Sequence, residues 1–141
     1  MFQTLNNASA AYAKVGVDMS VESANPHKLI LMLYDGALMS VASAAALGKG
    51  GDMQGMSEAI LKASAIISQG LRDSLDLSVG GELAVRLSAL YDYMCVRLQA
   101  ANLKGDQAIF AEVSRLLTEL RGAWREIEPD PAAPSRNQDA A

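Results

Sequence analysis

The segment from Leu83 to Leu103 constrains the fold most strongly, because its spacing predicts a helix with two apolar faces. One stripe recurs at steps of three and four residues, which places its members on one face: Leu83, Leu87, Leu90, Tyr91, Met94, Leu98 and Ala101. A second stripe lies beside it: Val85, Ala89, Tyr93, Val96, Ala100 and Leu103. One stripe can face a bundle core. The other must be covered by another helix, by a chain terminus or by a partner.

Composition favours an all-α protein of one domain. Half of the 141 residues are hydrophobic but only 5% are aromatic, and most of the apolar residues are good helix formers. The net charge is −4 and the twelve basic residues are scattered, which argues against a nucleic-acid partner. Cys95 is the only cysteine, so the chain has neither a disulfide framework nor a cysteine zinc site.

Start and stop signals divide the chain into four helices. Asn25 followed by Pro26 is a strong helix start, and Asp52 and Asp106 are further N-caps. In the second expected helix, which covers residues 53–75, Ile66 lies off the apolar stripe. Glycines such as Gly70 either weaken this helix or allow a neighbouring helix to approach closely. The expected helices cover residues 26–47, 53–75, 82–103 and 107–127. Their short links predict an antiparallel up-down four-helix bundle over residues 25–127.

The two ends of the chain differ from this central part. Residues 1–24 carry only scattered apolar side chains, with Tyr12 as the one large anchor of a short helical segment, and they lack the pattern of a secretion signal. We therefore expect a short N-terminal cap segment that must pack on something else. Residues 128–141 contain three prolines among small and polar residues, so we expect a disordered tail.

The apolar run at residues 29–47 approaches the length of a membrane span. Asp35 lies near its middle, where insertion into a membrane would cost about 2.5–3.5 kcal/mol. The rest of the run is rich in Ala and Ser, which contribute little to insertion. We therefore expect the central helix of a soluble bundle.

No pattern in the sequence predicts an enzyme. A di-metal bundle site needs Glu-x-x-His pairs, whereas His27 is the only histidine and is expected to be solvated. Asp35 and Asp92 each follow a tyrosine in an apolar run, and the simplest expectation is a solvated seam or a bond to a tyrosine or backbone group. We expect no catalytic residue, cofactor, metal or small-molecule substrate.

The apolar residues that exceed one stripe per helix leave two alternatives open for the role of this surface. It can form a groove for an amphipathic helix of another protein, by the helix-in-groove mode. It can equally belong to a crowded core plus the interface of a structural homodimer, or to some other interaction module.

Several segments, taken in order, resemble the flagellar secretion chaperone FliS family, the flagellin-specific export chaperones. The resemblance covers residues 8–127 and rests on these segments: Ala10-Ala11-Tyr12, Asn25-Pro26-His27-Lys28-Leu29-Ile30, Met32-Leu33-Tyr34-Asp35-Gly36-Ala37, Leu75-Asp76, Gly80-Gly81-Glu82-Leu83-Ala84, Leu90-Tyr91-Asp92-Tyr93-Met94, Arg97-Leu98, Ala101-Asn102 and Trp124. Some relatives carry a bulky apolar residue at the position of Ser9.

The resemblance implies a cytoplasmic bundle that binds the C-terminal segment of newly made flagellin. Binding would block premature polymerisation and keep flagellin competent for type III export, with transient contact to the export apparatus. It also implies that the segment around Tyr12 folds over the empty groove. We assign Leu87, Leu90, Tyr91, Met94 and Leu98 of the first stripe to the core. We expect these residues to bind the partner: Tyr12, Val85, Ala89, Tyr93, Val96, Ala100 and Leu103.

Overall fold

The computed structural model describes residues 25–127, so the expected cap segment at 1–24, with Tyr12, and the expected tail at 128–141 lie outside the described residues. Within residues 25–127 the chain forms helices and no strand. The elements are α2 (Pro26–Lys49), α3 (Met53–Ala65), the π-helix η2 (Ile66–Arg72), α4 (Leu77–Lys104) and α5 (Gln107–Glu126). The predicted all-α class is confirmed.

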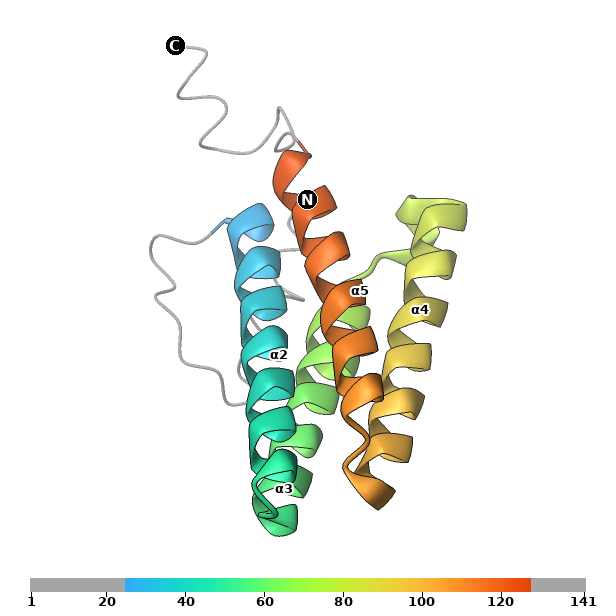
Figure 1. Cartoon of the computed structure of the whole chain (residues 1–141). Coiled ribbons are helices and arrows are strands. Elements are labelled where there is room, and N and C mark those ends of the chain that lie inside the picture. The colour runs from blue at the N-terminus through green and yellow to red at the C-terminus, as the bar shows by residue number, and fades with distance from the viewer. Residues whose placement is uncertain (1–24, 128–141) are drawn as a thin grey trace.

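The helices form an antiparallel up-down bundle (Figure 1). Each helix runs opposite to the one before it, with α3 and η2 forming one continuous arm. Helix α2 packs against α3 and α5, and α4 packs against α3, η2 and α5. Helices α2 and α4 therefore face each other across the diagonal of the bundle.

Local capping explains where most of the helices begin. The Asn25 side chain accepts a hydrogen bond from the backbone N–H of Lys28 at 2.8 Å, and Pro26 occupies the first turn. Asp52 and Asp106 cap α3 and α5 in the same way. Because a capping side chain satisfies an otherwise unpaired N–H of the first turn, these starts are strongly specified by the sequence.

Helix α4 begins earlier than expected. We predicted a connector at residues 76–81 and a start at Glu82, but Asp76 caps a helical turn that starts at Leu77. The Asp76 carboxylate accepts hydrogen bonds from both the backbone N–H and the hydroxyl of Ser78. Gly81 then breaks the helix with φ 58° and ψ −136°, a conformation that glycine adopts without a Cβ clash.

The second helical arm also differs from the prediction. It ends at Arg72 rather than Leu75, and its last seven residues form the π-helix η2. Both Ile66 and Ile67 are fully buried in the core, although the sequence pattern had left Ile66 off the stripe. Gly70 lies directly against Leu33, since a Cβ at this position would be 2.9 Å from the Leu33 Cδ2 atom. Close helix approach is therefore the role of Gly70.

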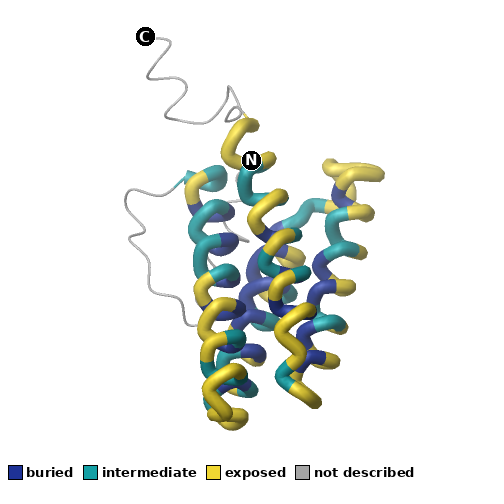
Figure 2. The backbone as a smooth tube through the Cα atoms, in the orientation of Figure 1, coloured by how far each residue is buried: buried dark blue, intermediate teal, exposed yellow. Residues whose placement is uncertain are grey.

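Buried residues line the inner faces of all the helices (Figure 2). Helix α2 contributes the largest share of this core: Leu29, Ile30, Leu33, Tyr34, Ala37, Ser40, Val41 and Ala44. Among the described helices, α2 alone is long and apolar enough to cross a membrane, with a mean hydropathy of 1.7. Its buried stripe shows that this apolar character serves the packing of the bundle.

Candidate protein-binding site

The first stripe of α4 faces the core over most of its length. Tyr91, Met94, Leu98 and Ala101 are buried, and Leu87 and Leu90 pack partly against the core. Leu83, the first residue of this stripe, does not reach the core, because 65% of it is exposed. Leu83 lies two residues after the Gly81 break and borders an open pocket instead of a packed helix.

All six residues of the second stripe are exposed on α4. We call Val85, Ala89, Tyr93, Val96, Ala100 and Leu103 the α4 row. The exposed fraction is 57% for Val85, 62% for Val96 and 81% for Leu103. At 1.5 Å per residue the row is about 27 Å long. Seven of the eleven exposed large apolar residues of the described chain lie on α4, which makes this helix the main apolar surface of the bundle.

Tyr93 is held in place within the α4 row by a neighbouring helix. Its hydroxyl donates a hydrogen bond to the Glu112 carboxylate on α5, and Arg97 donates to the other oxygen of that carboxylate at 2.8 Å. These two hydrogen bonds, with that of Tyr93 the larger cause, hold the pKa of Glu112 below its usual range. The hydrogen bond to the carboxylate raises the pKa of the Tyr93 hydroxyl. The Tyr93 ring is therefore fixed across the seam between α4 and α5.

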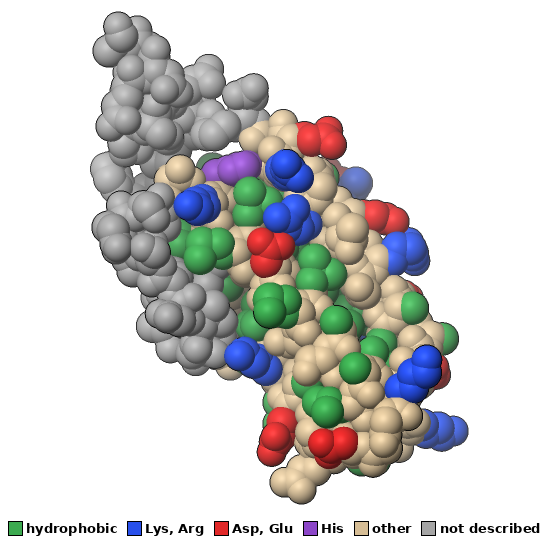
Figure 3. Space-filling view, turned by 60° about the vertical axis from the view of Figure 1, so that its left-hand side comes forward, with side chains coloured by type: hydrophobic (Ala, Val, Ile, Leu, Met, Phe, Trp, Pro, Cys, Tyr) green, Lys and Arg blue, Asp and Glu red, His purple; other side chains and the backbone are tan. Residues whose placement is uncertain are grey.

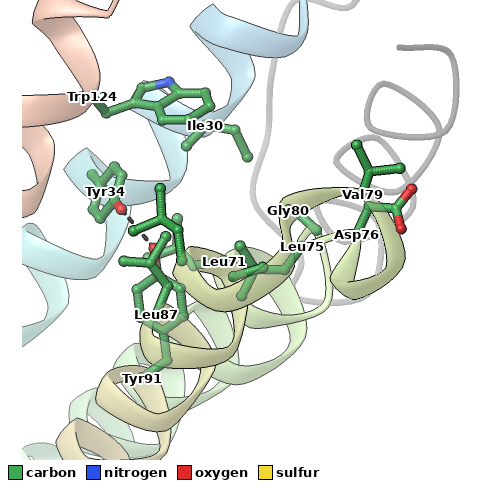
Figure 4. Close-up of a pocket in the computed structure, with 13 residues that line it drawn as sticks. Ile30, Tyr34, Leu71, Leu75, Asp76, Val79, Gly80, Leu87, Tyr91 and Trp124 are labelled. Atoms are coloured by element: carbon green, nitrogen blue, oxygen red, sulfur yellow. Dashed lines mark hydrogen bonds between the residues drawn. The ribbon is translucent and has the colours of Figure 1, made fainter.

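A pocket opens where α2 begins and α5 ends, beside the first turns of α4 (Figure 4). Its volume is about 260 Å³. Apolar side chains from α2, η2, α4 and α5 form most of its walls, including Ile30, Leu71, Leu83, Leu87 and Trp124. The sequence patterns did not predict this pocket, because its walls come from residues far apart in the chain.

Two tyrosines from opposite helices meet in this pocket. The hydroxyl oxygens of Tyr34 and Tyr91 are 2.6 Å apart, which joins α2 to α4 across the bundle diagonal (Figure 4). Burial is the main cause that raises the pKa of both hydroxyls, so both remain protonated at neutral pH. The sequence linked each tyrosine with the aspartate that follows it, whereas the structure pairs the tyrosines with each other.

Trp124 forms one wall of the pocket and is held by His27. The two rings are stacked, with centroids 5.3 Å apart and 17° between their planes. The indole N–H donates to the His27 carbonyl at 2.9 Å, and His27 Nε2 lies 2.8 Å from the Trp124 carbonyl oxygen, to which it donates. The expectation of a solvated His27 is therefore wrong, because this side chain is half-buried against Trp124.

The two aspartates bind arginines. Arg121 on α5 donates to both oxygens of Asp35, and Arg72 lies 2.9 Å from Asp92. Both carboxylates are also partly in solvent, with 49% of the Asp35 and 57% of the Asp92 side chain exposed, which agrees with the expected solvated seam. Ion pairs take the place of the alternative bonds to tyrosine or backbone groups, and the Asp35 pair joins α2 to α5. Within residues 25–127 no cluster of three His, Cys, Asp or Glu side chains has the arrangement of a metal site.

One face of the molecule (Figure 3) carries hydrophobic side chains that are interrupted by polar ones. Figure 3 shows its hydrophobic side chains in small groups, separated by polar and backbone surface, with His27 (purple) near the upper edge. Charged side chains lie between these groups.

An exposed apolar row along one helix is typical of helical bundles that bind other proteins. The family model described as Flagellar protein FliS matches residues 8–131. The chain belongs to the FliS family. Its class is that of a flagellar secretion chaperone, which is not a class of enzyme.

Curated relatives agree with this family over most of the chain. The flagellar secretion chaperone FliS of Salmonella typhimurium is 46% identical over 119 residues, which cover 84% of this chain and 88% of the relative. The flagellar secretion chaperone FliSB of Pseudomonas aeruginosa is 40% identical, with 83% and 92% covered. FliS of Bacillus subtilis is 40% identical, with 76% and 78% covered.

Proposed function

We propose that this protein is a cytoplasmic export chaperone that binds the C-terminal segment of flagellin. In this proposal, binding prevents premature polymerisation, keeps flagellin competent for type III flagellar export, and is followed by a transient contact with the export apparatus. The observation that carries the proposal is the exposure of all six residues of the α4 row. Family membership supplies the flagellar context.

The spacing of the α4 row fits a helical client. Its members follow one another at steps of four, four, three, four and three residues, which is the pattern of a seam between two packed helices. A row about 27 Å long matches one face of a helix of about 18 residues. Side chains of the client helix would fill the spaces between row residues, and would remove apolar surface from water on both sides.

A client that folds as it binds suits a chaperone that must later release it. Ordering a flexible segment costs conformational entropy, so only part of the buried apolar area is realised as affinity. The resulting complex combines a large contact surface with moderate affinity. This balance allows the client to be handed over at the export apparatus.

We further propose that Tyr12, outside the described residues, packs on the α4 row when no client is bound. A cap of this kind would compete with the client and lower its apparent affinity. Deleting residues 1–15 should therefore tighten client binding. An unchanged dissociation constant would contradict the proposed role of Tyr12.

The primary test is a calorimetric titration with a synthetic peptide from the C-terminal end of flagellin, followed by circular dichroism. Binding with a gain of helical signal is expected. In the variant Val96→Asp, a charge in the middle of the row must lose water on binding, so we expect binding at least about tenfold weaker.

Met39→Asp is the matched control for this variant. Met39 is 73% exposed and Val96 is 62% exposed, but Met39 lies on α2, across the bundle diagonal from α4. Met39→Asp should bind the peptide as the wild type does. Equal effects of the two variants, or no peptide binding by the wild type, would contradict the proposal.

The alternative of a structural homodimer makes a different prediction for the same surface. A dimer formed through the α4 row would persist on dilution in sedimentation velocity and would exclude the peptide. We expect instead that the peptide binds to a protein that sediments as a monomer at low micromolar concentration.

A further inference from the structure

The side chains of the α4 row differ in size along the helix. Four of its members are large, but Ala89 and Ala100 carry only a methyl group. Both alanines are exposed, so each leaves a low point in the row between larger neighbours, and we call these two positions the notches. Eleven residues separate them, which is about three helical turns or roughly 16.5 Å along the axis. The two notches therefore open on the same face of α4.

A ridge formed by Tyr93 and Val96 separates the two notches. The exposed fraction is 43% for Tyr93 and 62% for Val96. The Tyr93 ring cannot turn aside without losing its hydrogen bond to Glu112, so this part of the ridge is fixed. From notch to notch the row advances by four, three and four residues, an order that is the same in both directions. The row therefore constrains a helix packed on it in the same way whether that helix runs parallel or antiparallel to α4.

A helix that packs on this row must complement it in size. Facing side chains of two helices interdigitate where a large residue meets a small one, and they overpack where two large residues meet. We propose that the client helix carries two bulky apolar side chains eleven residues apart, which fill the notches, and small residues four and seven positions after the first, which face the ridge. This inference rests on the proposed function, because it describes the client of the α4 row. Ala89, Ala100 and Tyr93 then set the register in which the client binds.

Leucine in a notch distinguishes this packing from a row that binds any apolar surface. Ala89→Leu or Ala100→Leu adds apolar area to the row, so binding without a fixed register would become tighter. Leucine in a notch that receives a bulky side chain causes overpacking, so binding would become weaker. Both alanines are exposed within α4 and leucine is a strong helix former, so these variants should keep the fold.

Two designed helical peptides of the same composition test the size pattern without flagellin. The matched peptide carries Leu at i and i+11 and Ala at i+4 and i+7, and the exchanged peptide has Leu and Ala in each other's places. In calorimetric titration we expect the wild-type chain to bind the matched peptide about tenfold more tightly, because the exchanged peptide sets leucines against Tyr93 and Val96. Equal affinities, including no binding of either peptide, or tighter binding of the exchanged peptide, would overturn the proposal.

The two leucine variants test whether the notches make the contact. Ala89→Leu and Ala100→Leu should each bind the matched peptide about tenfold more weakly than the wild type does. Replacing the one peptide leucine that faces the new side chain by alanine should restore binding. Ala42→Leu is the matched control, because Ala42 is also exposed within a helix but lies on α2, across the bundle diagonal from α4, and it should leave the affinity unchanged. Unchanged or tighter binding by the two α4 variants would overturn the proposal.

The flagellin C-terminal peptide separates this inference from the proposed function. The wild-type chain should bind this peptide, and each leucine variant should bind it about tenfold more weakly. If the flagellin peptide does not bind while the matched peptide does, the proposed function fails and the size preference of the row stands. If the flagellin peptide binds both leucine variants as tightly as the wild type, the proposed function stands and this inference is overturned.

Discussion

His27 and Trp124 are 97 residues apart in the chain, and each makes a hydrogen bond to the backbone carbonyl of the other. Their rings also stack. This reciprocal contact fastens the first turn of α2 to the last turn of α5 and holds the Trp124 ring as a wall of the pocket. The helix ends, which would otherwise fray, are joined at the side of the molecule where the pocket opens.

The first prediction concerns this contact. His27→Ala removes the stacked ring and the hydrogen bond to the Trp124 carbonyl, so we expect a loss of about 1–2 kcal/mol in the free energy of unfolding. Urea denaturation followed by Trp124 fluorescence measures it. Lys28→Ala changes the next residue, whose side chain is exposed, and serves as the control. A loss no larger than that of the control would contradict the role given to His27.

The second prediction compares two glycines. Gly70→Ala places a methyl group 2.9 Å from Leu33 Cδ2, so we expect destabilisation by about 1–3 kcal/mol. Gly122→Ala on α5 meets nothing within 4 Å, so we expect stabilisation by about 0.5–1 kcal/mol from helix propensity. Thermal or urea unfolding of both variants measures the difference. Effects of the same sign would show that the packing of η2 against α2 is not as close as described.

The third prediction concerns pH. The hydrogen bond from Tyr93 is the largest cause of the lowered pKa of Glu112, so Tyr93→Phe should move that pKa upwards, towards its usual range. A carboxylate with a lowered pKa stabilises the fold above its pKa in the unfolded chain, and this stabilisation is lost as pH falls through the pKa of the folded state. Stability should therefore fall less steeply in acid for Glu112→Gln than for the wild type.

A carbon-detected NMR titration of the Glu112 carboxyl measures this shift. Val96→Ala changes a residue of the same row that touches no carboxylate, so it should leave the titration curve unchanged. An identical midpoint in the wild type and in Tyr93→Phe would refute the claim that the α4–α5 seam holds the Tyr93 ring.

Much of the fold follows from local signals. Asn25, Asp52 and Asp106 predict three helix starts correctly, because a cap depends on neighbouring residues alone. The 3.6-residue period also separates the two stripes of α4. Leu83 is the one residue of the first stripe that does not reach the core. The early start of this helix was missed because the two glycines after its first turn resemble a connector.

The features that the sequence patterns did not predict depend on contacts between residues that are distant in the chain. The π-helix changes the hydrogen-bond register without leaving a mark in the apolar pattern, so η2 was not predicted. The Tyr34–Tyr91 pair and the pocket arise only when α2 and α4 are brought together. Glu112, which holds Tyr93, likewise lies on a different helix and carries no local signal.

The central claim is that a flagellin segment covers the α4 row. Hydroxyl-radical footprinting of the chain, alone and with a saturating flagellin C-terminal peptide, tests it most directly. We predict that oxidation of Tyr93 and Leu103 falls several-fold in the complex, while Met39 on α2, which is also exposed, is oxidised as before. Unchanged oxidation of the α4 row with the peptide bound, or protection of Met39 instead, would contradict the account.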